Sequence, residues 1–114
     1  MQQNLEVARP PGGQLTGQAQ SFLNFCRVEK GLAANTISSY RTDLERFSNF
    51  SKTPAVDAGP EVLNQYLASL YDAMLSPKSI ARHVATLRNF YSYLAREGVI
   101  AQDPAEFLTP PKQW

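Results

Sequence analysis

Residues 31–44 read GLAANTISSYRTDL, and this segment holds a helix end, a helix start and a polar first turn. Gly31 suits the left-handed backbone conformation that commonly closes a helix. Asn35 or Thr36 can accept hydrogen bonds from the free amides that open the next helix. The segment therefore predicts two consecutive helices joined by a short turn.

Apolar residues recur at helical spacing on both sides of this turn. The first helix is expected to run from the cap residue Thr16 to Gly31, and the second to end near Ser51. Their apolar stripes are Ala19, Phe22, Leu23 and Cys26 before the turn, and Ile37, Tyr40, Leu44, Phe47 and Phe50 after it. Each stripe gives its helix one face to bury in a core.

Two proline-led starts predict two further helices. Pro60 and Pro77 each follow a small residue and suit the first position of a helix, where no amide hydrogen bond is lost. The helix that begins at Pro77 is expected to be the longest and to stop at Gly98. Its apolar stripe places Leu87 in the core opposite Leu44 of the second helix.

A last short helical turn is expected to open at Asp103 and Pro104 and to pack Phe107 and Leu108 onto the other helices. No strand-like alternation bounded by turn residues occurs in the sequence. The fold class is therefore predicted to be all-α, a compact bundle of four main helices plus a short C-terminal helical turn, within residues 15–108.

Length and composition bound the remaining possibilities. The 114 residues suffice for one domain, preceded by a flexible arm at 1–14 and followed by a proline-rich linker at 109–114. The net charge of +1 means that any basic surface must arise from segregation of charge. The single cysteine, Cys26, and the lack of an apolar run of membrane length predict a cytoplasmic protein with no membrane partner.

The sequence offers little for catalysis. Its single histidine, His83, has no nearby nucleophile or paired carboxylate in a recognisable arrangement. One histidine and one cysteine far apart match no metal-ligand spacing, and no phosphate-binding loop follows a strand. We therefore expect no catalytic residue, metal or cofactor.

Charge segregation instead favours nucleic acid. Residues 77–96 contain four basic residues and no acid, and one side of the predicted helix collects Arg82, Thr86, Asn89, Tyr93 and Arg96. Basic groups for phosphates beside short polar groups for base edges suit a helix in a DNA groove, although an ordinary solvated face has the same pattern. Arg82 is expected to be exposed on this face and dispensable for folding.

Several segments resemble one family. The pattern LAxNTIxxYRxDL at residues 32–44, together with EKGL at 29–32, LRNFYSYL at 87–94 and DPA at 103–105, resembles the N-terminal core-binding domain of Xer-type tyrosine recombinases, in the phage integrase family. The resemblance covers residues 21–111. It implies a SAM-like helical bundle that clamps one side of a recombination site on duplex DNA.

The resemblance also implies partners and site residues. A separate C-terminal domain carries the tyrosine nucleophile in that family, and we expect it to lie outside this sequence; that catalytic domain and sister recombinase protomers are the implied protein partners. Many relatives have serine at the position of Ala33, so the cap of the second helix is expected at Asn35. The implied DNA-facing residues are Asn35, Thr36, Ser39, Arg41, Lys78, Ser79, Arg82, His83 and Thr86.

Two other classes of function remain open from the sequence. SAM-like bundles also serve as protein–protein interaction modules, and an independent enzyme is a more distant alternative. Within the recombinase class, the sequence does not separate chromosome dimer resolution from phage, integron or transposon recombination.

Overall fold

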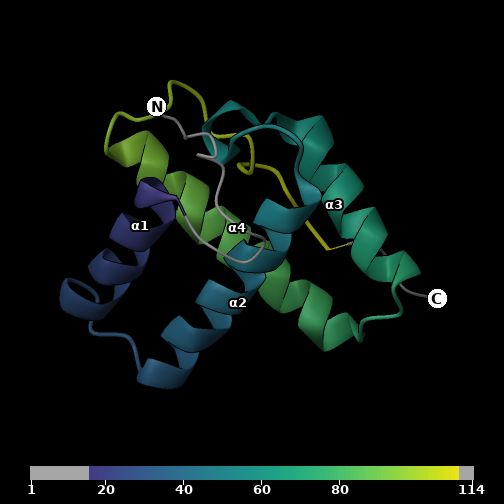
Figure 1. Cartoon of the computed structure of the whole chain (residues 1–114), viewed down its shortest axis with the longest axis horizontal. Helices are drawn as coiled ribbons and strands as arrows, with labels where there is room; N and C mark the ends of the chain where they lie inside the picture. The colour runs from purple at the N-terminus through teal and green to yellow at the C-terminus, as the bar shows by residue number, and fades with distance from the viewer. Residues whose placement is uncertain (1–15, 111–114) are drawn as a thin grey trace, which may run out of the picture.

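The computed structural model describes residues 16–110, and every regular element among them is helical (Figure 1). The predicted arm at 1–14 and most of the predicted linker lie outside these residues. The elements are α1 (Gly17–Val28), α2 (Ala34–Phe50), the short 3-10 helix η1 (Ala55–Asp57), α3 (Pro60–Asp72) and α4 (Pro77–Arg96). The all-α fold of four main helices is confirmed.

Helix α4 is the central element of the bundle. It packs against α1, α2 and α3, and α1 also packs against α2. Figure 1 shows α2 crossing in front of α4, so that the first turns of both helices lie along the lower edge of the view. This crossing determines which side chains of α2 and α4 meet.

The core contains the predicted stripes. Leu44 and Leu87 are 2% and 1% exposed, as expected for the middle of the two longest stripes. Phe22 packs edge-on against Phe90, and Phe47 packs edge-on against Tyr66. Such pairs bury large apolar areas in geometries that aromatic rings favour.

The helix starts agree with the sequence at three of four places. Thr16 accepts a hydrogen bond from the Ala19 amide at 3.4 Å, Ser76 accepts one from Ser79 at 3.1 Å, and α3 begins at Pro60. The cap predicted for α2 is wrong, because the helix begins at Ala34 and its cap residue is Ala33, with no side-chain hydrogen bond. Asn35 and Thr36 lie inside the first turn instead.

The helix ends depend on three left-handed residues. Gly31 and Gly98 have φ of 63° and 76°, as their places after α1 and α4 predicted. Met74 has φ of 66° after α3 and is the one such residue with a side chain in the described part. The amides of Met74 and Leu75 bond to the carbonyls of Tyr71 and Leu70, the pattern of a Schellman helix end.

The C-terminal segment is only partly as predicted. It forms hydrogen-bonded turns rather than a helix, and the Asp103 carboxylate accepts a bond from the Ala105 amide at 2.8 Å. Leu108 is buried, but Phe107 is 85% exposed, so its predicted packing is wrong. In this tight turn Ala105 and Leu108 face the core, and the intervening Phe107 points away from it.

Candidate nucleic-acid interface

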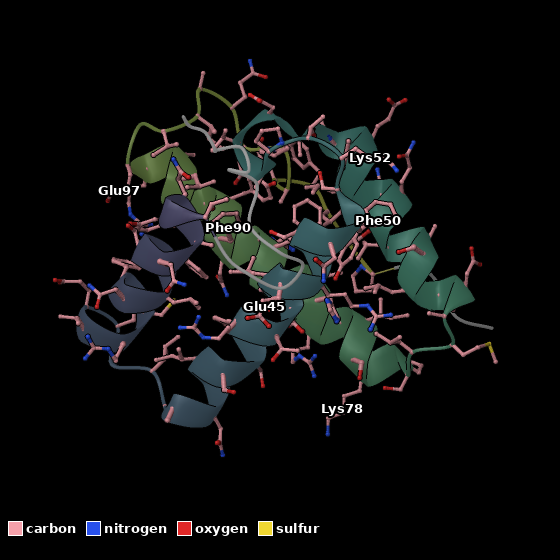
Figure 2. The ribbon with its side chains drawn as sticks, in the orientation of Figure 1. Glu45, Phe50, Lys52, Lys78, Phe90 and Glu97 are labelled. Carbon is pink, nitrogen blue, oxygen red and sulfur yellow. The ribbon has the colours of Figure 1, made fainter. Side chains whose placement is uncertain are left out.

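The predicted site residues come from the first halves of α2 and α4, which lie along one edge of the molecule (Figure 1). Asn35 and Lys78 are exposed, and Lys78 projects from this edge in Figure 2. The remaining surface positions, Thr36, Ser39, Arg41 and Ser79, are half-buried. The Arg82 side chain is 43% exposed. Seven of the nine predicted residues are therefore at least partly accessible.

His83 and Thr86 are placed differently from the prediction. They are 3% and 0% exposed, so neither side chain can reach a groove of DNA from this position. The predicted polar face included a residue that is not on the surface. Thr86 lies one turn after Arg82, on the side of α4 that α2 covers. Both side chains belong to the interior.

The group that draws them inward is Asp43 of α2, which is 2% exposed. Its carboxylate accepts two hydrogen bonds from Arg82, from Nε at 3.0 Å and from Nη2 at 2.6 Å. The Thr86 hydroxyl donates a third at 2.7 Å, and His83 Nε2 lies 3.3 Å away. One buried carboxylate thus joins α2 to three residues of α4.

The network continues from His83 into α3. The Tyr66 hydroxyl lies 3.0 Å from His83 Nδ1. Burial lowers the pKa of His83 and, although Asp43 opposes this, Arg82 and Arg46 lower it further. Burial also raises the pKa of Tyr66, so the phenol keeps its proton. A neutral His83 that accepts from Tyr66 at Nδ1 and turns Nε2–H toward Asp43 satisfies both contacts.

Sequence reasoning missed Asp43, although a signal was present. Asp43 stands three residues after Tyr40 and four before Phe47, which places it on the apolar stripe of α2. A carboxylate at such a position needs a cationic or hydrogen-bonding partner. The predicted helix at 77–96, which has four basic residues and no acid, could supply that partner.

A second group of basic residues flanks the start of α2. Arg27 of α1 and Arg41 of α2 line a groove together with Leu32, Ala34, Ile37 and Ser38. Arg27 is oriented by a 2.8 Å bond from its Nη2 to the Asn24 side chain. We call the surface formed by Arg27, Arg41, Lys78 and Arg82 the basic edge.

The two remaining bases of α4 are engaged elsewhere. Arg96 lies over the ring of Phe25, 5.0 Å from its centre, and Arg88 reaches the carbonyl of Leu108 at 3.5 Å. Cation–π and carbonyl contacts of this kind hold arginine stems on the protein. Of the four basic residues of α4, Lys78 and Arg82 therefore form its contribution to the basic edge.

Charge is segregated along the chain. Segments 53–77 and 97–110 contain six acidic residues and no lysine or arginine, whereas segments 16–52 and 78–96 contain nine basic and three acidic residues. One of those three acids, Asp43, is buried beneath Arg82. Along the chain, α3 and its flanking segments and the C-terminal turns are therefore acidic, whereas most of the basic residues belong to α1, α2 and α4.

Within residues 16–110, no helix combines the length and apolar character needed to span a bilayer.

These features define a small all-helical domain with a basic edge on α1, α2 and α4. Residues 19–98 match the phage integrase N-terminal SAM-like domain family, and the chain belongs to that family. The resemblance stated from the sequence is thereby confirmed.

Proteins named Tyrosine recombinase XerD are among the relatives of this chain, and three of them illustrate the similarity. The protein of Listeria innocua is 38% identical over 97 residues, covering 81% of this chain and 33% of the relative. The proteins of Staphylococcus epidermidis and Staphylococcus aureus are each 35% identical, over 97 and 99 residues, covering 82% of this chain and 33% of the relative. The chain thus spans about a third of the length of these relatives. No solved structure matches it.

Proposed function

We propose that this domain binds duplex DNA through the basic edge, as the core-binding domain of a site-specific tyrosine recombinase. The observation that carries the proposal is the gathering of Arg27, Arg41, Lys78 and Arg82 on one edge of an otherwise near-neutral chain. Basic side chains beside helix N-termini are suited to backbone phosphates. The relatives named tyrosine recombinases support the same assignment.

In this role the domain clamps one side of a recombination site. Asn35, Thr36, Ser39 and Ser79 supply short polar groups beside the charges, and these can contact phosphates or base edges. Strand exchange belongs to a tyrosine-bearing C-terminal domain of the full-length recombinase, and sister protomers assemble with it on DNA. Neither His83 nor Tyr66 has a catalytic role here, because both are buried in the Asp43 network.

The test is a titration of labelled duplex with the 114-residue chain at several salt concentrations. We expect weak binding with little sequence preference, with a Kd on the order of 10⁻⁴ to 10⁻⁶ M at physiological salt. Affinity should fall steeply as salt rises, because bound phosphates release counterions. Absence of binding at low salt and high micromolar protein would contradict the proposal.

A matched pair of lysine variants locates the interface. Lys78 lies on the basic edge and Lys52 beyond the far end of α2, well separated in Figure 2. Lys78→Gln should weaken binding and reduce the salt slope by about 1, as for the loss of one phosphate contact. Lys52→Gln makes the same charge change and should have a smaller effect. Equal effects would mean that the basic edge is not the contact surface.

The rival assignment, a SAM-like protein–protein interaction module, predicts a different salt response. Docking of an apolar helix into a groove buries few ions and depends weakly on salt. If the chain does not bind DNA but binds a protein partner with an affinity that changes little with salt, the protein–protein interaction module would be favoured.

A further inference from the structure

The Arg82 side chain is exposed, but the Asp43 carboxylate that it binds is buried. Arg82 Nε and Nη2 are bonded to a carboxylate that is 1% exposed, while the Arg82 side chain itself is 43% exposed. A guanidinium has five N–H donors, and the two bonds to Asp43 use only two of them. Solvent or a ligand can therefore reach the arginine, but it cannot reach the carboxylate.

The Asp43 carboxylate is itself held by side chains other than Arg82. Thr86 donates to Oδ2 of Asp43 and His83 lies against Oδ1, so the carboxylate plane is set by two further side chains of α4. His83 is in turn bonded to Tyr66 of α3. A two-bond guanidinium–carboxylate pair on such a support fixes both the position and the plane of Arg82.

A fixed arginine loses less rotamer freedom when it binds a phosphate than a free one does. Arg82 meets this condition, because its orientation is set when α2 and α4 pack and not when a ligand arrives. Its support differs from that of Arg27, whose guanidinium bonds to an exposed amide on its own helix.

We propose that Asp43 is a positioning residue for DNA binding: it holds Arg82 so that the free N–H groups of the guanidinium meet a backbone phosphate. The inference rests on the proposed function, and it names which arginine is prepared for phosphate and by what. The proposal requires that a negatively charged residue, Asp43, favours the binding of DNA, which is also negatively charged.

A positioning role for Asp43 and a purely electrostatic effect of its charge predict opposite results for the substitution Asp43→Asn. Asp43→Asn removes a negative charge, so electrostatics alone would strengthen DNA binding. If Asp43 positions Arg82, the same substitution weakens binding, by about twofold to tenfold for one side chain released to move. Glu45→Gln is the matched control: Glu45 lies on the same helix, in view on α2 in Figure 2, and the change of charge is identical. It should leave binding unchanged or stronger.

A double-mutant cycle separates positioning from a general effect on the fold. In an Arg82→Ala background, Asp43→Asn has no arginine to release and should no longer weaken binding. Each variant is melted by circular dichroism first, and binding is measured well below its Tm. Where Asp43→Asn does not fold, Arg82→Lys replaces it, because lysine keeps the charge but cannot make the two-bond pair. That variant should bind more weakly with an unchanged salt slope.

A readout without DNA completes the design. The Nε–H of Arg82 should exchange slowly with water in the wild-type chain and rapidly in Asp43→Asn, as followed by nitrogen NMR. Folded Asp43→Asn that binds DNA as tightly as wild type, or an equal loss in the Arg82→Ala background, would overturn the positioning role. Failure of the wild-type chain to bind duplex would overturn the proposed function, and with it the phosphate partner, even if Nε–H exchange shows that Asp43 orders Arg82.

Discussion

Arg82 serves the fold as well as the surface, because the carboxylate beneath it is almost fully buried. A buried carboxylate is costly unless it is paired, and removal of one partner costs more than the pair contributes. Arg82 supplies two of the hydrogen bonds that Asp43 accepts. The prediction that Arg82 is dispensable for folding is therefore replaced by the opposite expectation.

We predict that Arg82→Ala lowers the free energy of unfolding by ~1–3 kcal/mol, as for a buried charged acceptor that loses its donors. The upper end of the range for buried pairs is not expected, because Thr86 still donates to Asp43. Urea unfolding followed by circular dichroism measures the change. Lys78→Ala is the control, because Lys78 is exposed, and its midpoint should stay close to that of wild type.

His83 should make stability depend on pH. Burial lowers its pKa below the ordinary 6.5, so as pH falls below about 6.5 the unfolded chain takes up a proton before the folded chain does. The stability contributed by neutral His83 is then lost as pH falls toward the folded-state pKa. We expect the urea midpoint to drop between about pH 7.5 and about pH 5.5. The drop should be smaller in His83→Gln, and an equal drop in both proteins would contradict this account.

At the scale of residues, the sequence could identify the exposed charges but not their partners. Lys78 was placed correctly on the surface, because helical spacing alone puts it off the apolar stripe, and Asn35 is exposed although its predicted role as the cap of α2 is wrong. The pairing of Asp43 with Arg82 joins positions 39 apart, and it depends on where α2 crosses α4. Local periodicity contains no information on that crossing.

At the scale of elements, the end of α3 is strained where the ends of α1 and α4 are relaxed. Met74 has the positive φ that Gly31 and Gly98 have, and its side chain is 87% exposed. A side chain in this region costs about 1–2 kcal/mol, and an exposed methionine regains little of it by packing. Glycine at the same place also makes the unfolded chain more flexible, which offsets part of the gain.

We predict that Met74→Gly raises the free energy of unfolding by about 0.5–1 kcal/mol. The converse change, Gly98→Ala, should lower it by about 1 kcal/mol. Nothing lies within 4 Å of a Cβ built at Gly98, so the loss reflects backbone strain alone. Thermal melts of the two variants should shift in opposite directions. A fall in Tm for Met74→Gly would mean that the methionine side chain contributes contacts of its own.

The helix boundaries could be predicted because glycine, proline and serine mark them directly. Thr16, Pro60, Ser76 and Gly98 all lie at the expected ends. The start of α2 was misjudged because Ala33 has no side-chain acceptor, and its extended backbone alone ends the turn. The 3-10 helix η1 was missed, since three residues are too few to show a period.

At the scale of the whole molecule, one core supports the basic edge. Helix α4 contacts all three other main helices, and eight of its residues are buried. Tyr91 adds a 2.7 Å hydrogen bond from its hydroxyl to the Ala55 carbonyl, which ties α4 to the connection between α2 and α3. The loss of core packing along α4 should therefore weaken every surface of the domain together.

We predict that Leu87→Ala costs ~2–5 kcal/mol of stability, the usual range for a leucine removed from a packed core. This is a large part of the ~5–15 kcal/mol that stabilises an ordinary domain. DNA binding should be lost at temperatures where the variant unfolds and retained below them. Leu44→Ala should behave in the same way. A Tm close to that of wild type would mean that the core at the crossing of α2 and α4 adapts to the cavity.

Family and fold were predictable at this scale because the spacing of apolar residues and the quoted motifs extend over most of the chain.

Because Cys26 is buried, the rate at which its thiol is labelled can report how often α1 opens. Its thiol is 1% exposed in α1, and burial raises its pKa, so it is both shielded and protonated in the native bundle. An aromatic disulfide reagent can therefore react with it only during moments when α1 has opened. The labelling rate of the native chain should be far below that of the urea-unfolded chain, and the ratio of the two rates measures how often α1 leaves its neighbours. Equal rates would show that α1 opens freely, and any variant that speeds labelling without lowering Tm would identify contacts that hold this helix alone.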